Sequence, residues 1–346
     1  AGLVTNVALD AQNPQKYLTF EVGRSTIRQG NAIIAAYNGN DIMWSWHIWV
    51  TNYDPNSPTS TDSLKVADRD IRFSYYGNYY DLATVNVGWV YIGLTVFPER
   101  EVVLKFEQKG NPQNYQTFRI LQTEHQLPNR GFGMFYQWGR KDPFPAWFAT
   151  FTKRKFRDND TEGFIADIPA VTSGGTYADL IKNPEVFYGG KPNSQVLWNL
   201  SSNIADNTLK TIYDPCPVGY CVASQRALEY LIQYNKSHQD SEANNFDGSW
   251  WGRYFFNEGG QQKIWLPATG HRNDVDGTTQ NKEYAHDQGE GTDATYWSST
   301  SSGYNMAYCI NFYGWVGCTF VDNAQGHDLS SLSMNYGECV RMMREK

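Results

Sequence analysis

The sequence predicts a strand-dominated α+β fold with long irregular loops and few helices. Aromatic residues make up 15% of the 346 residues, with 23 Tyr, 18 Phe and 12 Trp, and aromatic side chains are enriched in strands. Turn residues separate short alternating segments, which is the pattern of antiparallel strands. Only residues 176–183 and 224–238 have helical signals, and in the second an N-cap serine, Ser224, precedes an apolar stripe.

The N-terminal part of the chain is expected to contain a β-hairpin. Residues 31–37 form an apolar run that ends in the turn residues 38–41, and residues 42–50 follow as a second strand. We interpret His47 as a hydrogen-bonded histidine of the sheet, with a functional role as the alternative. The opposite face of the second strand carries every second residue, namely Trp44, Trp46, Ile48 and Val50.

Further strands are predicted at 85–96, 101–108, 115–123 and 337–343. Residues 101–108 alternate between apolar and polar side chains. We expect Val102, Leu104 and Phe106 to point into the core.

The chain is predicted to comprise an N-terminal β-rich region, residues 1–125, and a C-terminal domain, residues 126–346. The alternative is that both regions pack as one unit. The Pro/Ser/Thr-rich stretch 54–62 is interpreted as an exposed loop, because strand patterns resume on both sides of it.

A long polar stretch lies between the predicted strands 264–266 and 306–312. Its roughly forty residues contain too much Gly, Asp and Asn to form a core, and a loop of that length in a compact domain usually binds something or is disordered. Trp265, Tyr296 and Trp297 bracket the stretch. We therefore expect an ordered surface loop region carried on a β scaffold.

Charge and hydropathy exclude two classes of partner. The net charge is −7 and charged residues reach only 19%, which argues against binding to nucleic acid or anionic lipid. The sequence has no transmembrane segment, since no apolar run approaches the ~18 residues of a membrane span. The chain begins at Ala1 without methionine or signal peptide, and we interpret it as the processed product of a secreted protein.

The five cysteines all lie beyond residue 215. A disulfide between Cys216 and Cys339 would join the two ends of that segment, and closing so long a loop contributes about 4–5 kcal/mol in the chain-entropy model. A second disulfide between Cys309 and Cys318 would link the two strands of a hairpin. Cys221 would then be the one cysteine without a disulfide partner. The alternative is five buried thiols in a reducing compartment.

A glycan site requires an aromatic platform and fixed polar groups. Trp250, Trp251 and Arg253 are candidates for the platform, with two core tryptophans as the alternative. The polar groups would come from the central stretch, to which Trp297 is added as an aromatic neighbour. These polar candidates are His271, Arg272, Asn273 and Asp274.

Calcium is the one cofactor that the sequence suggests. Asp274 and Asp276 alternate ahead of Gly277, which suits a hard cation with oxygen ligands. The alternative, a solvated turn, is the better interpretation. In the exposed loop, Ser63 lies in an Asp-Ser-Leu triplet and is a candidate for O-glycosylation.

Six motifs occur in order along the chain. They are WSWHIWV at 44–50, YQWGRKDP at 136–143, DPCPVGY at 214–220, WLPATG at 265–270, YWSS at 296–299 and CVR at 339–341. Together they resemble the surface proteins of Bacteroidetes that carry the Fibrobacter succinogenes major paralogous domain, which are often fimbrillin-like or pilus-tip proteins. The resemblance covers about residues 31–345. The family commonly has a GYRVP-like run where this chain has Cys221-Val222-Ala223, so the pairing of Cys221 stays open.

The resemblance implies a C-type-lectin-like fold, similar also to that of formylglycine-generating enzymes. It further implies a secreted or outer-membrane surface location and a role in cell adhesion. Partners would be other fimbrial or surface subunits and a glycan or a host or bacterial surface protein.

We therefore predict a non-catalytic adhesin or fimbrial subunit, with no catalytic residues. One alternative is a structural filament subunit without a small ligand. The other is an enzyme of the formylglycine-generating-like fold with Cys309 and Cys318 as its thiols. The sequence contains no Gly-rich phosphate loop, H-E-x-x-H or G-x-S-x-G motif.

Overall fold

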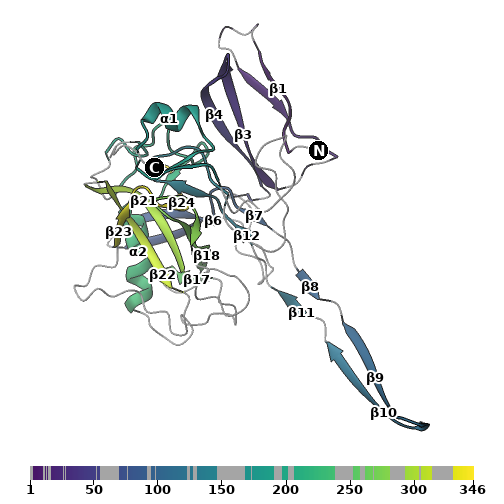
Figure 1. The fold of residues 1–346 in the computed structure, drawn as a ribbon. Helices are drawn as coiled ribbons and strands as arrows, with labels where there is room; N and C mark the ends of the chain where they lie inside the picture. Colours follow the sequence, from purple (N-terminus) through teal and green to yellow (C-terminus); the bar gives the residue numbers. More distant parts are fainter. Residues whose placement is uncertain are drawn as a thin grey trace.

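A computed structural model gives the fold of the chain (Figure 1). The residues that it describes are 3–10, 12, 14, 17–25, 27, 29–51, 53–54, 70–75, 77–91, 95–97, 99–122, 125–127, 131–145, 168–172, 174–190, 197–201, 206–237, 252–257, 262–267, 269–280, 293–303, 305–313 and 330–346.

Strands dominate this structure and helices are few, as the sequence predicts. The strands are β1 (Thr5–Leu9), β2 (Leu18–Glu21), β3 (Gly30–Asn38), β4 (Asp41–Val50), β5 (Ile71–Tyr75), β6 (Asn78–Asn86), β7 (Val90–Tyr91), β8 (Thr95–Phe97), β9 (Arg100–Gln108), β10 (Asn111–Gln122), β11 (His125–Leu127), β12 (Gly131–Phe132), β13 (Phe135–Gln137), β14 (Ala170–Val171), β15 (Phe187–Tyr188), β16 (Tyr220–Val222), β17 (Gly252–Phe256), β18 (Lys263–Pro267), β19 (His271–Arg272), β20 (Thr279–Gln280), β21 (Asp293–Gly303), β22 (Met306–Tyr313), β23 (Ser330–Ser333) and β24 (Gly337–Arg344). The helices are α1 (Tyr177–Lys182) and α2 (Gln225–Ser237).

The C-terminal strand β24 is the centre of a ten-stranded sheet. Its first half pairs antiparallel with β13 on one side and parallel with β21 on the other. Its second half lies between β6 and β16. All of its residues before Arg344 are buried, including the charged residues Glu338 and Arg341. A strand covered on both faces does not alternate between apolar and exposed polar residues, so buried charges of this kind need partners within the protein.

Successive side chains of β24 enter two separate hydrophobic clusters. Cys339 and Met343 belong to a first cluster that also contains Leu228 of α2. Val340 and Met342 belong to a second cluster on the other face. This second cluster is built around the fully buried tryptophans Trp138, Trp198 and Trp297.

A buried arginine on β24 connects the sheet to neighbouring strands. Arg341 is fully buried and donates from Nη1 to the carbonyl of Ala83 in β6 at 3.1 Å. Its Nη2 donates to the carbonyl of Trp265 in β18 at 2.9 Å. Burial lowers the pKa of the guanidinium, and the two carbonyls compensate for part of the lost hydration.

Both predicted helices form, and the first turn of each is capped; the cap of α2 is the one that the sequence predicts. Ser224 precedes α2, and its hydroxyl accepts from the backbone N–H of Ala227 at 3.2 Å. Thr176 and Asp179 form a reciprocal capping box at the start of α1.

The predicted N-terminal hairpin is confirmed as β3 and β4, which pair along their whole length. Gly39 forms the turn with φ of 62°, a conformation that favours glycine. The hairpin contacts the sheet-containing body through Ser45, whose hydroxyl donates to Asp142 at 2.8 Å.

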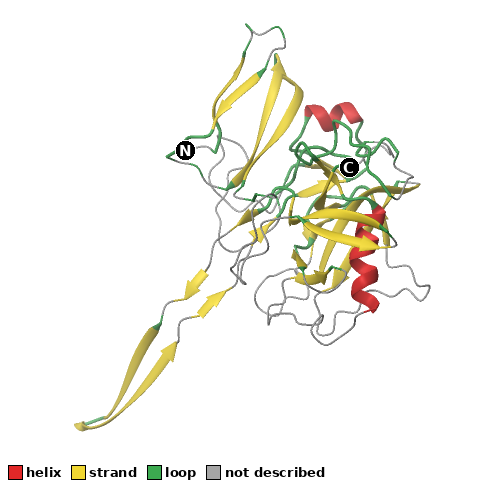
Figure 2. Cartoon of the chain, turned by 180° about the vertical axis from the view of Figure 1, so that it is seen from behind, coloured by secondary structure: helices red, strands yellow, loops and turns green. Residues whose placement is uncertain are grey.

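A long two-stranded ribbon projects from the body (Figures 1 and 2). It consists of three successive antiparallel pairs, β7 with β12, β8 with β11 and β9 with β10. The predicted strand 85–96 is therefore interrupted. Gly88, with φ of 75°, makes the break, since a Cβ there would lie 2.6 Å from the Met134 side chain.

The outer part of the ribbon corrects one prediction. Residues 101–108 alternate as expected, but Val102, Leu104 and Phe106 are 52%, 39% and 58% exposed and do not enter the core. The ribbon has only two strands here and lies away from the body, so nothing in the described chain covers its apolar side.

The central stretch is also different from its prediction. Part of the expected loop is β21, which pairs with β22 and β24. Tyr296 and Trp297 are fully buried, and the serines that follow are buried too. Ser298 fits in the strand because its hydroxyl accepts from the backbone N–H of Thr300 at 3.2 Å. Small hydroxyl side chains thus satisfy themselves locally and permit a polar sequence inside the sheet.

The division at residues 125 and 126 does not separate two sheets. β5 and β6, which precede the ribbon, belong to the sheet of β24. β3 and β4 form their own two-stranded sheet. The body is therefore assembled from segments on both sides of the ribbon.

We expect Arg341→Met to lower the free energy of unfolding by about 3 kcal/mol, because two buried carbonyls lose their donor. Urea denaturation measures the change. Arg72→Met is the matched control, since the Arg72 side chain is 58% exposed and pairs with Asp81 at the surface; its cost should stay below about 1 kcal/mol. Equal costs for both variants would contradict the structural role assigned to Arg341.

Candidate functional site

Several predicted site residues lie outside the described part of the chain. Trp250 and Trp251 are among them, as are Ser63 and Cys318. Arg253 lies in β17, where it pairs with Leu266 of β18. The aromatic platform and the O-glycosylation site therefore stay predictions.

Two predicted ligand-binding residues are buried. Arg272 is 0% exposed, and its guanidinium donates to the carbonyls of Pro145 at 2.7 Å and Gly277 at 2.7 Å. Trp297 is also 0% exposed, and its indole N–H donates to the carbonyl of Tyr136 at 2.9 Å. Both predictions of direct ligand contact are wrong for this conformation, because both side chains are enclosed by protein.

The candidate calcium ligands lie in a tight turn between β19 and β20. Asn273 accepts from the backbone N–H of Val275 at 2.9 Å. Asp276 accepts from both the N–H and the hydroxyl of Thr278, at 3.0 and 2.8 Å. Asp274 lies on the same turn, close enough to Tyr336 to contribute, after burial, to raising the pKa of that phenol. His271 stacks edge-on against Tyr336.

The acidic run thus forms a hydrogen-bonded turn, which agrees with the preferred of the two interpretations of the sequence, the solvated turn. Among the described residues, no three His, Cys, Asp or Glu side chains are grouped as a metal site requires. Calcium binding remains a prediction.

The predicted Cys216–Cys339 disulfide is not formed. Both side chains are buried free thiols, and they lie in the two different hydrophobic clusters on opposite faces of the sheet. The Cys339 thiol lies 3.0 Å from the hydroxyl of Thr269, and burial raises its pKa to about 12. Cys309 is buried in β22, and its pairing with Cys318 falls outside the described residues.

The DPCPVGY motif is a structural turn. The Asp214 carboxylate accepts from the backbone N–H groups of Cys216 at 2.8 Å and Val222 at 2.9 Å. Burial raises its pKa to about 6. Lys210 caps the same turn by donating to the carbonyls of Cys216 and Pro217.

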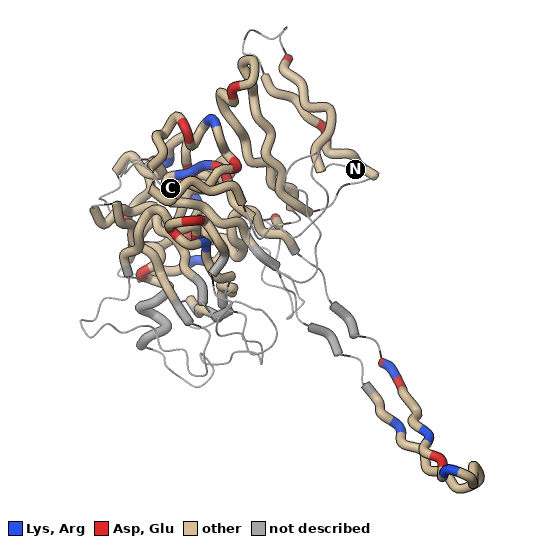
Figure 3. The backbone as a smooth tube through the Cα atoms, viewed as in Figure 1, with Lys and Arg blue, Asp and Glu red and all other residues tan. Residues whose placement is uncertain are grey.

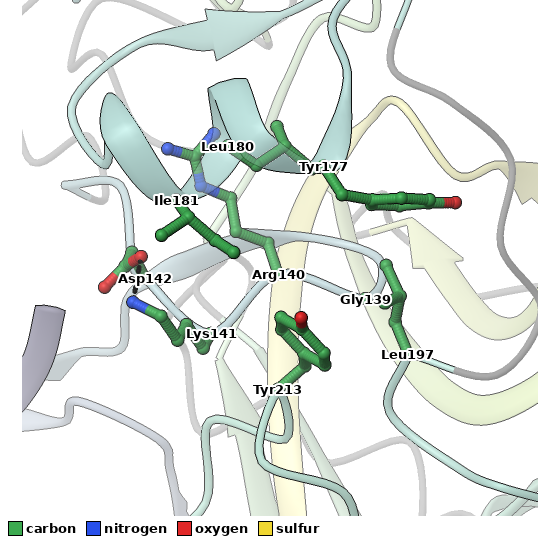
Figure 4. A pocket seen from close by; sticks show the side chains of 9 residues that line it. All are labelled: Gly139, Arg140, Lys141, Asp142, Tyr177, Leu180, Ile181, Leu197 and Tyr213. Atoms are coloured by element: carbon green, nitrogen blue, oxygen red, sulfur yellow. Dashed lines mark hydrogen bonds and ion pairs between the residues drawn. The ribbon is translucent and has the colours of Figure 1, made fainter. Parts of the chain in front are cut away.

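A small hollow lies beneath α1, between the YQWGRKDP segment and Tyr213 (Figure 4). Its empty volume is about 260 Å³ including its open mouth, which is below the range of typical small-molecule pockets. The residues around it are Gly139, Arg140, Lys141, Asp142, Tyr177, Leu180, Ile181, Leu197 and Tyr213.

The charged side chains beside this hollow hold elements together. Lys141 donates to Asp142 at 2.6 Å and to the carbonyl of Ser45 in β4 at 2.9 Å. Arg140 donates to the carbonyls of Pro184 at 2.6 Å and Val186 at 2.7 Å. The ammonium of Lys141 and both Nη atoms of Arg140 therefore have protein acceptors, and one of these is the carbonyl of Asn183 at the end of α1. The segment thus fastens the β3–β4 hairpin and α1 to the body.

His47 is hydrogen-bonded within the protein, as the sequence suggests. Its Nε2 lies 2.8 Å from Oδ1 of Asn31, and its Nδ1 lies 3.1 Å from the hydroxyl of Tyr136. The neutral ring that donates from Nε2 and accepts at Nδ1 fits both partners. Burial lowers the pKa of His47 to about 4.

Among the described residues, many of the exposed large apolar side chains lie on the hairpins, which the sequence did not indicate as a site. On β9 and β10 the exposed apolar side chains include Val102, Leu104, Phe106, Phe118 and Ile120. On the N-terminal hairpins they include Val7, Leu9, Phe20, Met43 and Trp46. Exposed apolar patches of this kind mark sites of protein association.

Comparisons with known proteins add no relative. No family model, curated protein or solved structure matches the chain. Within the described part of the chain, no helix is long and apolar enough to span a membrane.

We expect Trp297→Ala to lower the free energy of unfolding by about 3–5 kcal/mol, because it removes a buried indole and leaves a cavity. Val218→Ala is the control, since Val218 is 98% exposed, and should cost less than about 0.5 kcal/mol. A Trp297→Ala variant with unchanged unfolding but reduced ligand binding would restore the binding role.

We also expect His47 to make folding sensitive to acid. The pKa of His47 in the folded protein, about 4, is below its ordinary value of 6.5. Stability from the neutral ring is therefore complete above pH 6.5 and is lost as the pH falls toward 4, by about 3 kcal/mol. His47→Gln should flatten this part of the stability–pH profile. His271→Gln serves as the control, and an equal flattening by both variants would contradict the assignment.

Proposed function

We propose that this chain is a non-catalytic subunit of a cell-surface assembly, an adhesin or fimbrial subunit that binds protein partners through projecting β-hairpins. The proposal includes the C-type-lectin-like fold, the secreted or outer-membrane location and the kinship with Bacteroidetes surface proteins that the motif order suggests. The alternative is a structural filament subunit, whose partners would all be other subunits of the filament.

One observation carries the proposal: the apolar side of the β9–β10 hairpin is exposed, although the hairpin has regular pairing from Arg100 to Glu107 of β9. A two-stranded ribbon alone in water is at best marginally stable. An apolar stripe that stays in solvent provides no stabilisation within the monomer. Its presence is explained if a partner covers it.

The buried positions of Arg272 and Trp297 favour protein partners over glycans. These two side chains were among the polar and aromatic candidates of the central stretch, and both form hydrogen bonds within the fold instead. The thiol-based enzyme is disfavoured by the burial of Cys309, because a catalytic thiolate must be reached by substrate.

The test is the size of the native assembly. Surface material sheared from the cells that make this chain is separated by native size and probed for the chain. We expect recovery in particles far larger than 39.5 kDa, and at least a tenfold loss from that fraction for the Phe106→Ser/Phe118→Ser double variant.

The Val103→Ser/Leu121→Ser variant is the matched control, since it makes two equivalent changes on the other face of the same hairpin. It should assemble normally. Recovery of the wild-type chain only as a monomer inside the cell would overturn the proposal.

A further inference from the structure

The β9–β10 hairpin, called the arm below, is residues 100–122, and its two faces differ sharply. In the register of the strands, Leu104 lies opposite Phe118 and Val102 lies opposite Ile120. Directly opposite residues of an antiparallel pair share one face, so these residues lie together with Phe106. We call Val102, Leu104, Phe106, Phe118 and Ile120 the apolar face of the arm.

The other face of the arm carries its charges. Arg119 pairs with Glu101 at 3.1 Å, and Lys105 pairs with Glu107. Lys105 also lies over the ring of Tyr115, 4.4 Å from its centroid. Val103, Tyr115 and Leu121 on this face are exposed too, but they lie among these paired charges, whereas the apolar face has five adjoining apolar side chains.

We propose that the arm is a dimerisation element: the apolar face packs against the same face of a second copy of this chain, with the two arms antiparallel. This inference rests on the proposed function and names the partner of its surface. The five side chains of the apolar face are all uncharged, and the charged Arg100 lies at its root end. Such a face is complementary to itself, which is the requirement of a two-fold interface. The arm extends away from the body, so a second arm can reach it without a clash of the two bodies (Figures 1 and 2).

The exposed area agrees with a weak but specific dimer. The five side chains of the apolar face are 39% to 58% exposed. With aromatic side chains of 150–250 Å² each, they present on the order of 500 Å² per copy. Pairing would remove about 1,000 Å² from water, at the lower limit for a specific interface. Addition of a strand to an arm edge would leave this face in solvent and is therefore less favourable.

The bodies at the roots of the two arms select the antiparallel arrangement. It places the bodies at opposite ends of the paired arms, whereas a parallel arrangement would bring them side by side (Figure 1). The charges give no preference, because Arg119 pairs with Glu101 and the root of the arm has no net charge when both strands are counted (Figure 3).

Two measurements on the purified full-length chain test the inference. Sedimentation between ~1 and 100 µM should show a monomer–dimer equilibrium with a dissociation constant in the micromolar range. The Phe106→Ser/Phe118→Ser variant should weaken it at least tenfold, and the Val103→Ser/Leu121→Ser control should not.

Single-cysteine variants then locate the contact. Leu104→Cys lies near the middle of the apolar face and should form a covalent dimer on mild oxidation. Val103→Cys, its neighbour on the opposite face, should not. The described native cysteines are buried, and the unmodified chain measures any background dimer.

A monomer at 100 µM, or equal cross-linking by both cysteine variants, overturns the self-association. If Phe106→Ser/Phe118→Ser still prevents assembly on the cell surface in that case, the proposed function stands with a different protein as the partner of the arm.

Discussion

The body of this protein depends on the enclosure of β24 on both edges and both faces. Five strands (β6, β13, β16, β19 and β21) pair with its two edges, and two hydrophobic clusters cover its faces. A strand in that position cannot hydrate a charge, so Arg341 must find its acceptors inside the protein. Arg341 donates hydrogen bonds to the carbonyls of Ala83 and Trp265, which belong to strands far apart in the sequence. The last strand of the chain therefore determines how earlier segments come together.

The same constraint explains the motifs that the sequence presented as functional. Trp138 donates its indole N–H to the carbonyl of Ser298, and Trp297 donates to that of Tyr136. The tryptophans and serines of separate motifs thus bond one another across the sheet. Their order along the chain reflects an architecture of buried polar contacts, and it gives no direct information about a ligand.

Local patterns predicted the parts of the fold that depend on local physics. The β3–β4 hairpin and the caps of α2 follow from turn residues and an N-cap serine, and both were predictable. The burial of β21 was not, because its Ser/Thr-rich sequence is typical of a loop until its strand partners are known. The prediction of a Cys216–Cys339 disulfide was wrong for the same reason. The sequence does not show that these two cysteines lie on opposite faces of a sheet.

The arm shows the limit of periodicity most clearly. An alternation of apolar and polar residues specifies that a strand has an apolar face, but it does not specify what covers that face. For β4 the covering comes partly from the body, through contacts such as Lys141 with Ser45. For β9 the described chain provides none. The pattern in β9 is therefore equally regular, but it leaves an apolar face that the described part of the chain does not cover, and we propose that a second copy of the chain covers it.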